Sequence, residues 1–213
     1  QLWNKGLVYE GYKIMPWCPH CETVLSNYEV SEGYADIADL SAYVKFPITT
    51  EGELNGVKLI AWTTTPWTLP GNVALAINSA FTYAVVKITS TENVTEKIII
   101  LKSSLEKMTE LLKDKFTLEV ESEIAGEKLV GLSYTAPFNY FPAEKNMHMV
   151  WGGEFVTDTD GTGIVHIAPA FGDDDMKLAQ ANDLPVVKHV TPAGEFAPEV
   201  TDLSGKVKPK EDH

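Results

Sequence analysis

The sequence predicts a mainly β, α+β fold: a compact β-barrel decorated by a few helices. About eight short segments either alternate apolar and polar residues or are rich in β-branched residues, as strands are. Two modest helices are expected, at residues 103–114, where apolar residues recur at helical spacing, and at residues 173–181. Strands and helices do not alternate along the chain, which argues against a parallel sheet of βαβ units.

The first forty residues are expected to differ from the rest. Residues 2–14 alternate around Gly11 and predict a hairpin-like start. A turn containing two cysteines follows at residues 17–21. We expect residues 1–40 to form a stalk or linker that need not pack on the remainder of the chain.

The main domain is expected to span residues 41–190. Its strand candidates are 42–48, 57–62, 73–77, 83–88, 97–101, 116–120, 147–150 and 163–167. Segments 83–88 and 97–101 are expected to form a hairpin, and a second long hairpin should run from 147 to 167. Segment 73–77 is interpreted as the return strand of 57–62.

Two helices and a tail complete the prediction. Ser103 and Ser104 offer an N-cap to a helix that ends near Asp114 and covers a sheet. The second helix, 173–181, begins with three aspartates, which the helix dipole favours. Residues 191–213 contain proline and glycine and are expected to be irregular at the surface.

Composition narrows the functional classes. With 213 residues and 44% hydrophobic content, the chain can bury a sizeable core. Its net charge is -13 and every basic residue is lysine, which argues against a broad nucleic-acid surface. A small pocket for a single-stranded RNA end remains compatible with this charge. No apolar run approaches the ~20 residues that a membrane-spanning helix needs.

Residues 62–72, WTTTPWTLPGN, form the most unusual stretch. Pro66 and Pro70 each fix φ and remove a donor, which predicts a rigid, extended loop at a sheet edge. Hydroxyl groups beside aromatic rings suit a polar ligand with an apolar part. The alternative is an ordinary threonine-rich edge strand followed by a Pro-Gly turn.

A second stretch, DTDGTGIVHIAPAFGDDD at 158–175, changes this interpretation. Together the two stretches resemble the paired motifs of the editing domain, connective peptide 1, of class I aminoacyl-tRNA synthetases with branched aliphatic substrates. The first stretch is similar to the isoleucyl branch, because the valyl and leucyl relatives carry an arginine where this chain has Thr65. The resemblance implies the same barrel and a fragment of a larger enzyme. Gly161 and Gly163 are expected to allow a tight turn and close backbone approach.

The resemblance implies a hydrolytic function within an isoleucine–tRNA ligase. A pocket discriminates one methylene by only ~1–3 kcal/mol, a limit for which isoleucyl enzymes are the standard example. The expected reaction is hydrolysis of the ester joining valine to the 3′ end of tRNA(Ile), and of valyl-adenylate in the same site. The expected partners are that RNA end and the rest of the synthetase chain, in a cytoplasmic, monomeric protein without a membrane contact.

The resemblance also assigns site residues. Thr64 and Thr65 are expected to orient the water and the ester, and Asp175 to anchor the substrate ammonium by a charge-assisted hydrogen bond. Asp174 is the second candidate for that anchor, with helix capping as its alternative. No threonine has an evident base beside it, so we expect water attack assisted by the substrate's ribose hydroxyl.

The remaining pocket residues are assigned in the same way. Thr63 and Thr68 are expected to line the pocket, and His166 to exclude the extra methylene of isoleucine. Trp62 and Asn72 are expected to shape the pocket and hold the adenosine, with core packing and a turn cap as the alternatives. Ala170 and Phe171 stand where many relatives have Gly-His, which argues against a mechanism using a pair of histidines.

Cys18 and Cys21 match one half of a tetrahedral zinc site. In the isoleucyl family the second cysteine pair follows the editing insertion, so zinc is expected here only in the full-length enzyme; two reduced cysteines are the alternative. His20 is a weak third candidate ligand. Editing itself needs no cofactor, and ATP and magnesium belong to the parent catalytic core.

Two other functions remain open. The first is the editing domain of a valyl- or leucyl-type synthetase. The second is a module that binds the tRNA 3′ end, or a structural insert, without catalysis.

Overall fold

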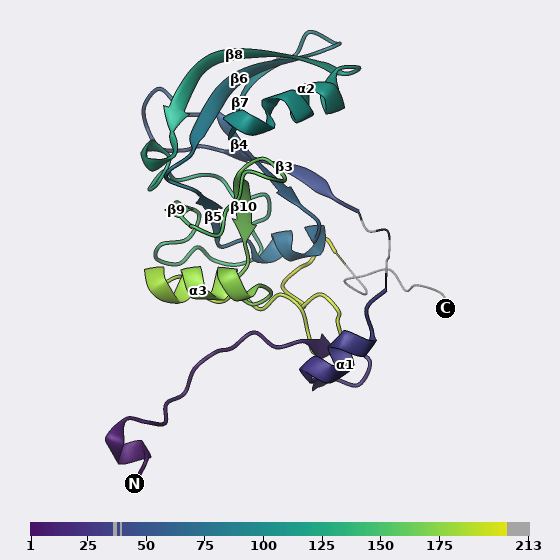
Figure 1. Ribbon diagram of the computed structural model, residues 1–213, viewed down its shortest axis with the longest axis vertical. Coiled ribbons are helices and arrows are strands. Elements are labelled where there is room, and N and C mark those ends of the chain that lie inside the picture. Colours follow the sequence, from purple (N-terminus) through teal and green to yellow (C-terminus); the bar gives the residue numbers. More distant parts are fainter. Residues whose placement is uncertain (36–37, 39, 204–213) are drawn as a thin grey trace.

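The computed structural model describes residues 1–35, 38 and 40–203 (Figure 1). The elements in chain order are η1 (Trp3–Lys5), β1 (Trp17–Cys18), β2 (Thr23–Val24), α1 (Asn27–Glu32), β3 (Ala42–Pro47), β4 (Lys58–Thr63), η2 (Pro66–Gly71), β5 (Ala74–Ile77), β6 (Thr82–Ser90), β7 (Thr95–Leu101), η3 (Lys102–Ser104), α2 (Leu105–Leu112), β8 (Phe116–Ala125), η4 (Gly126–Lys128), β9 (Val150–Gly152), β10 (Ile164–Ile167) and α3 (Asp173–Asn182). Helices labelled η are 3₁₀ helices.

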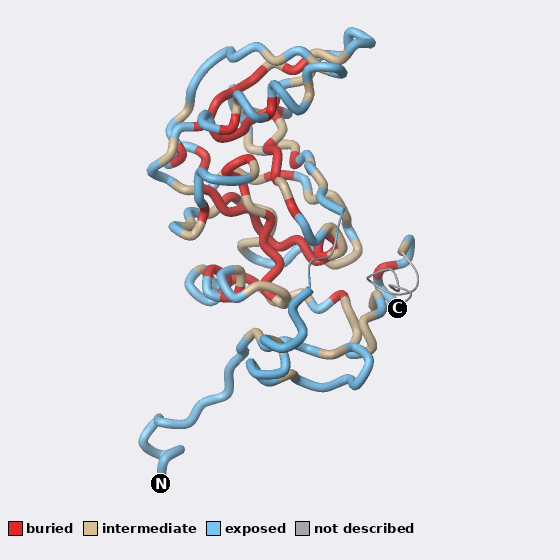
Figure 2. Tube along the Cα trace, turned by 45° about the vertical axis from the view of Figure 1, so that its right-hand side comes forward, coloured by how far each residue is buried: buried red, intermediate tan, exposed pale blue. Residues whose placement is uncertain are grey.

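Helix α2 packs on one face of the five-stranded sheet, and the other face of that sheet packs on the three-stranded sheet. Helix α3 packs against the three-stranded sheet and lies below it in Figure 1. Successive side chains of a strand point to opposite faces of the sheet, which explains how the layers pack. In β6, Tyr83 and Val85 face the core between the sheets, whereas Ala84 and Val86 face the cluster under α2. In β5, Leu75 and Ile77 face the same central core, and Ala74 and Ala76 pack towards α3. Buried residues run through the middle of the molecule (Figure 2).

The prediction of a closed barrel is wrong for the part of the chain that the structure describes. The five-stranded sheet has the order β3-β4-β7-β6-β8, the three-stranded sheet has the order β10-β5-β9, and β1 and β2 form a separate two-stranded sheet. β4 pairs with β7 over only two residues, Lys58 and Leu59, before the strands diverge. β10 lies beside β4 but forms its ladder with β5. The α+β class is confirmed, because the molecule is mostly sheet with few helices.

Several local predictions also need correction. Residues 7–16 form no hairpin, because the alternating segment has no partner strand. The loop expected to be extended at residues 66–71 is the 3₁₀ helix η2, whose first residue, Pro66, has a φ suited to a helix start. β9 and β10 flank β5 instead of pairing with each other, and β5 returns to the second sheet instead of to β4.

The helices are short. α2 and α3 confirm the two predicted helices, and α1 was not predicted. The sequence contains a signal for α1, because Ser26 and Glu29 form a capping box. Among residues 1–35, 38 and 40–203, no helix has the length and apolar character needed to cross a membrane.

The cysteine turn packs on the C-terminal segment of the described chain. The Trp17 indole donates to the Pro192 carbonyl at 2.8 Å. A Cβ added to Gly194 would lie 2.8 Å from Pro19. Residues 190 and 196 form a β-bridge, and Val200 is buried. The start of the tail is therefore tied down, whereas residues 204–213 lie outside the described residues, and the predicted domain boundaries stay predictions.

Candidate functional site

The register of β5 against β10 brings the two unusual stretches together. These strands pair antiparallel, with Ala74 opposite Ile167, and the Val73 amide donates to the Ile167 carbonyl at 2.9 Å. Antiparallel pairing places the segment that enters β5 beside the segment that leaves β10. The threonine loop, residues 62–72, therefore lies beside the acidic loop, residues 168–175.

The threonine loop is held by its own hydroxyl groups. Thr63 Oγ1 accepts the Thr65 amide at 3.1 Å. Thr68 Oγ1 donates to the Thr65 carbonyl at 2.8 Å, within the turn that begins η2. Thr63 and Thr68 are buried, whereas Thr64 and Thr65 are exposed. The two residues expected to orient water and ester are thus the ones that solvent reaches, and their roles stay predictions.

Trp62 packs under the turn at Gly161. A Cβ at Gly161 would lie 3.1 Å from the Trp62 ring, and the glycine has φ 73°. At Gly163, with φ 70°, a Cβ would lie 2.5 Å from Leu101. The predicted need for glycine at both positions is confirmed. The contact places Trp62 against the loop that precedes β10, and its role towards a substrate is untested.

His166, on β10, is the centre of a buried hydrogen-bond network, and its side chain is 6% exposed. Its Nδ1 lies 2.8 Å from Asn72 Nδ2, and its Nε2 lies 2.9 Å from Thr68 Oγ1. Asn72 Nδ2 also donates to the Ala74 carbonyl at 3.0 Å. Asn72 Oδ1 accepts from the Tyr134 hydroxyl at 2.8 Å. The network therefore runs from Tyr134 in the core to the threonine loop.

These partners define the protonation of His166. The Ala74 carbonyl can only accept, so the Asn72 atom facing it is the amide nitrogen, which donates its second hydrogen to His166 Nδ1. Burial, with a smaller contribution from nearby His189, lowers the pKa of His166 to about 3. The neutral ring therefore carries its hydrogen on Nε2 and donates it to Thr68 Oγ1. Neither nitrogen keeps a free lone pair, which rules out a role as general base in this arrangement.

The buried neutral imidazole should make stability depend on pH. The pKa of His166 falls from 6.5 in the unfolded chain to about 3 in the folded one, so the unfolded chain binds the proton first as pH falls. This contribution to stability is complete above pH 6.5 and is lost as pH falls towards 3. Between pH 7 and pH 5, we expect wild type to lose ~2 kcal/mol more unfolding free energy than H166Q does, from 1.36 kcal/mol per pKa unit.

Urea unfolding at the two pH values measures this difference. H20Q, at an exposed histidine outside the network, is the matched control and should lose as much as wild type. Equal losses in wild type and H166Q would show that His166 is not the group responsible.

Asp175 lies at the start of α3 with its carboxylate turned back towards β10. Its Oδ2 accepts the Ala168 amide at 2.8 Å, and a Cβ at Gly172 would lie 2.8 Å from its carboxyl carbon. Burial raises the pKa of Asp175 to about 6, and the neighbouring Asp174 adds to the shift. The carboxylate is therefore ionised at pH 7 but poorly solvated, a state that an incoming cation would stabilise.

The neighbouring acids differ from Asp175. Asp173 and Asp174 are exposed and form ion pairs with Lys177 at 2.6 and 3.1 Å. Lys177 is itself exposed, and these two partners raise its pKa. Asp174, the second candidate for the anchor, is thus already paired on the outer surface of α3.

Aromatic rings join the threonine loop to the acidic loop. Phe171 lies edge-on to Trp67, with ring centroids 5.3 Å apart, and edge-on to His189 at 4.7 Å. Sequence reasoning missed His189 and Tyr134. Pro70 does indicate that a carbonyl of this loop needs a donor from elsewhere, but it does not indicate that the donor is His189.

The cysteine pair offers two sulfur atoms. Cys18 Sγ accepts the Cys21 amide at 3.4 Å, and the backbone and thiol of Cys21 lower the pKa of Cys18. A sulfur that accepts an N–H is favoured as the thiolate that zinc binds, so the pair fits one half of a zinc site. No cluster of three His, Cys, Asp or Glu side chains suited to a metal occurs in residues 1–35, 38 and 40–203. Zinc at this pair stays an expectation.

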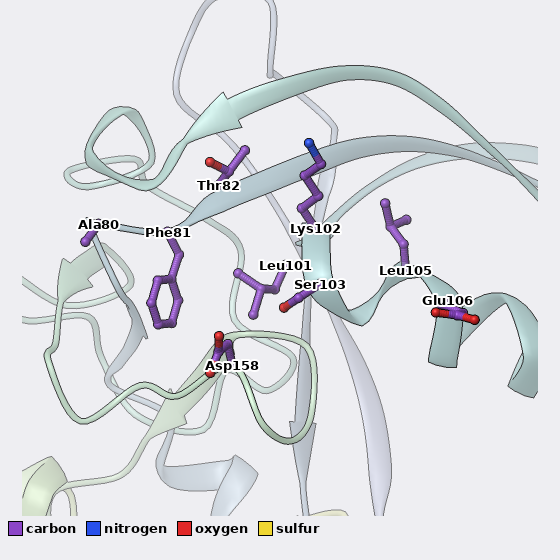
Figure 3. Close-up of a pocket in the computed structure, with 9 residues that line it drawn as sticks. All are labelled: Ala80, Phe81, Thr82, Leu101, Lys102, Ser103, Leu105, Glu106 and Asp158. Carbon is purple, nitrogen blue, oxygen red and sulfur yellow. The ribbon is translucent and has the colours of Figure 1, made fainter.

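One hollow near the start of α2 lies away from these residues. It has a volume of about 620 Å³ and is shown in Figure 3 with its lining residues Ala80, Phe81, Thr82, Leu101, Lys102, Ser103, Leu105, Glu106 and Asp158. Leu101 abuts Gly163, at the start of β10, whereas His166 is near the end of that strand. None of the predicted site residues lines this hollow, so its chemistry is separate from theirs.

Comparison with known proteins identifies relatives over nearly the whole chain. The family model for tRNA synthetases class I (I, L, M and V) matches residues 1–188. Isoleucine–tRNA ligase of Clostridium kluyveri is 44% identical over 205 residues, which are 96% of this chain and 18% of that protein. That of Clostridium acetobutylicum is 45% identical over 212 residues, 100% of this chain and 19% of that protein. The chain therefore spans less than a fifth of the length of these curated relatives.

Solved structures share the fold. The editing domain of P. knowlesi cytosolic leucyl-tRNA synthetase superposes with a TM-score of 0.54 at 16% identity, covering 71% of this chain and 65% of that chain. The crystal structure of GlLeuRS-CP1 superposes with a TM-score of 0.52 at 19% identity, covering 68% and 65%. At such identities the likeness concerns the fold alone.

Proposed function

Because the chain belongs to the class I tRNA synthetases (I, L, M and V) and has the fold of an editing domain, we propose that it hydrolyses valine mischarged onto tRNA(Ile). The observation that carries this proposal is the pairing of β5 with β10. It brings the threonine loop, through Thr68 and Trp67, into contact with His166 and with Phe171 in the loop that leads to Asp175. Hydrolysis of valyl-adenylate in the same site belongs to the proposal.

Asp175 is the group suited to bind the substrate's ammonium. Its partly desolvated carboxylate already accepts one backbone N–H and keeps further lone pairs for a cation. A charge-assisted hydrogen bond to an ammonium group is stronger where water is scarce. Asp175 would therefore orient the amino acid and place its ester carbonyl towards the threonine loop.

The threonines supply hydroxyl groups that both donate and accept. Thr64 and Thr65 are exposed and lie beside the buried pair, Thr63 and Thr68, that holds the loop. A hydroxyl of this kind can hydrogen-bond the ester carbonyl and position a water molecule. His166, the histidine bonded to Thr68, has both ring nitrogens engaged and offers no general base, which supports attack by water assisted by the substrate's ribose hydroxyl.

His166 suits a role in size selection. Its ring is held from both sides by hydrogen bonds, so it cannot swing away to admit a larger side chain. Its neutral state avoids repelling the substrate ammonium. Asn72 has its amide nitrogen fully engaged, and this burial favours a positioning role under His166 over contact with the adenosine.

The acidic surface is consistent with a partner that contributes only a short single-stranded end. The net charge is -13, so a long phosphate backbone would be repelled. In this proposal, the rest of the synthetase chain holds the body of the tRNA, and this chain receives the aminoacylated adenosine.

Deacylation of preformed aminoacyl-tRNA(Ile) tests the proposal. With the chain in excess in single-turnover assays, we expect the valyl ester to be hydrolysed at least ~10-fold faster than the isoleucyl ester, the ratio that one methylene allows. Preferred hydrolysis of the threonyl or methionyl ester would indicate a valyl- or leucyl-type site instead. Binding without hydrolysis of any ester would show a non-catalytic module.

A further inference from the structure

We propose that His189 is a positioning residue for the threonine loop: it donates to the Trp67 carbonyl the hydrogen bond that Pro70 cannot supply, and thereby holds Thr68 against His166. The effect on catalysis rests on the editing function proposed above, whereas the structural role of His189 is independent of that function.

The contact between His189 and the loop spans 122 residues of sequence. His189 Nε2 lies 3.0 Å from the Trp67 carbonyl oxygen. A carbonyl oxygen can only accept, so Nε2 carries the hydrogen and donates it. The imidazole is 0% exposed, so water does not compete for this bond.

The loop needs an external donor because of its own sequence. In a 3₁₀ helix, the carbonyl of residue i accepts from the amide of residue i+3. For Trp67 in η2 that residue is Pro70, which has no amide hydrogen. The neighbouring turns are complete, since the Thr68 amide donates to Thr65 at 2.9 Å and the Asn72 amide to Leu69 at 3.0 Å. Trp67 is thus the position in η2 where the proline breaks the ladder.

The packing of the ring shows why a histidine occupies this place. A Cβ at Gly71 would lie 2.2 Å from His189 Nδ1, so the ring lies directly on the loop backbone. The rings of Phe171 and Phe196 pack against the imidazole, with centroids 4.7 and 6.2 Å from its own. A phenyl group in place of the imidazole would suit these surroundings equally well. Nδ1 is buried without a hydrogen-bond partner among the described residues, which costs stability. The advantage of histidine over phenylalanine at this position is therefore the hydrogen bond that Nε2 donates.

The hydrogen bond from His189 affects the candidate site through Thr68. Trp67 directly precedes Thr68, whose hydroxyl accepts from His166 and donates to the Thr65 carbonyl. Releasing the Trp67 carbonyl would loosen the turn that sets both bonds. Phe171, which contacts both Trp67 and His189, would then lose its fixed place beside the acidic loop.

Two substitutions separate the donor from the ring. H189F keeps an aromatic ring and removes the donor, whereas H189Q removes the ring and keeps an N–H near the position of Nε2. Hydrogen exchange followed by NMR is the readout that does not depend on activity. We expect H189F to speed exchange of the Thr68 and Asn72 amides about tenfold. In H189Q the logarithm of each exchange rate should lie at least halfway back from the H189F value to the wild-type value. Amides of the β6–β7 ladder should be unchanged in both.

Deacylation kinetics give the second readout. We expect H189F to lower kcat about tenfold with KM within twofold, because the loop is misplaced while RNA contacts remain, and H189Q to recover most of kcat. F196L, which removes a ring stacked on His189 but not the donor, is the matched control and should keep the wild-type kcat.

The outcomes distinguish the two proposals. Unchanged exchange at Thr68 and Asn72 in H189F overturns the positioning role. Equal losses in H189F and H189Q, with exchange faster throughout the molecule, also overturn it, because the residue would then serve only packing. Faster local exchange in H189F, in a chain whose wild type hydrolyses no ester, supports the positioning role and rejects the editing function.

Discussion

Replacing Asp175 with alanine is expected to lower kcat/KM for valyl-tRNA(Ile) about 100-fold, which is the loss of ~2.7 kcal/mol from a hydrogen bond to a charged group. The carboxylate is the half-buried anion of the acidic loop, and burial has already raised its pKa to about 6. A substrate ammonium would relieve that unfavourable burial. Single-turnover deacylation with chain in excess measures the effect.

The controls separate charge from folding. D175N keeps an oxygen for the Ala168 amide but removes the charge, and it should be nearly as impaired as D175A. D174A, at an exposed acid already paired with Lys177, should stay within about threefold of wild type. Wild-type kcat/KM should fall as pH drops below about 6, since protonation removes the anion, and D175N should lose this dependence. Full activity in D175N would reject the anchor role.

Replacing Asn72 with alanine is expected to destabilise the fold by ~4 kcal/mol, one of the largest effects that a single polar substitution could have here. Its amide makes three buried hydrogen bonds, to Ala74, His166 and Tyr134. Alanine leaves each of those partners without its bond and out of reach of bulk water. Urea unfolding at pH 7 measures the change.

A double-mutant cycle identifies the source of that loss. Y134F removes only the hydroxyl that donates to Asn72 and should cost ~1 kcal/mol. The double variant N72A/Y134F should be less unstable than the sum of the two, because alanine leaves no acceptor for the hydroxyl to lose. N27A, at an exposed helix start, should stay within ~0.5 kcal/mol of wild type. Additive losses would contradict a shared network.

The strands could be predicted because they carry their own pattern. β6 and β7 alternate between two cores, so β-branched runs predicted both strands and their pairing. The partners of β5 could not be predicted in the same way. Its four residues are all buried, which gives no preferred face, and it lies between strands that follow it by more than seventy positions. The barrel prediction failed for the same reason, because sheet closure depends on pairing and not on strand count.

The candidate site was predictable in its residues and not in its connections. Motif resemblance indicated Thr64, His166 and Asp175, but no sequence rule pairs Asn72 with Tyr134 or Trp67 with His189. These contacts depend on tertiary packing. The prolines that predicted an extended loop instead begin and interrupt a 3₁₀ helix, since a fixed φ of about -65° suits both conformations.

The two occupied nitrogens of His166 have a chemical consequence. An imidazole whose heteroatoms are both engaged within the fold can offer a ligand only its carbon–hydrogen edge, so a residue usually counted as hydrophilic contributes a hydrocarbon surface. Because the proton on this ring changes only near its pKa of about 3, that surface keeps the same character from mildly acidic to alkaline solution.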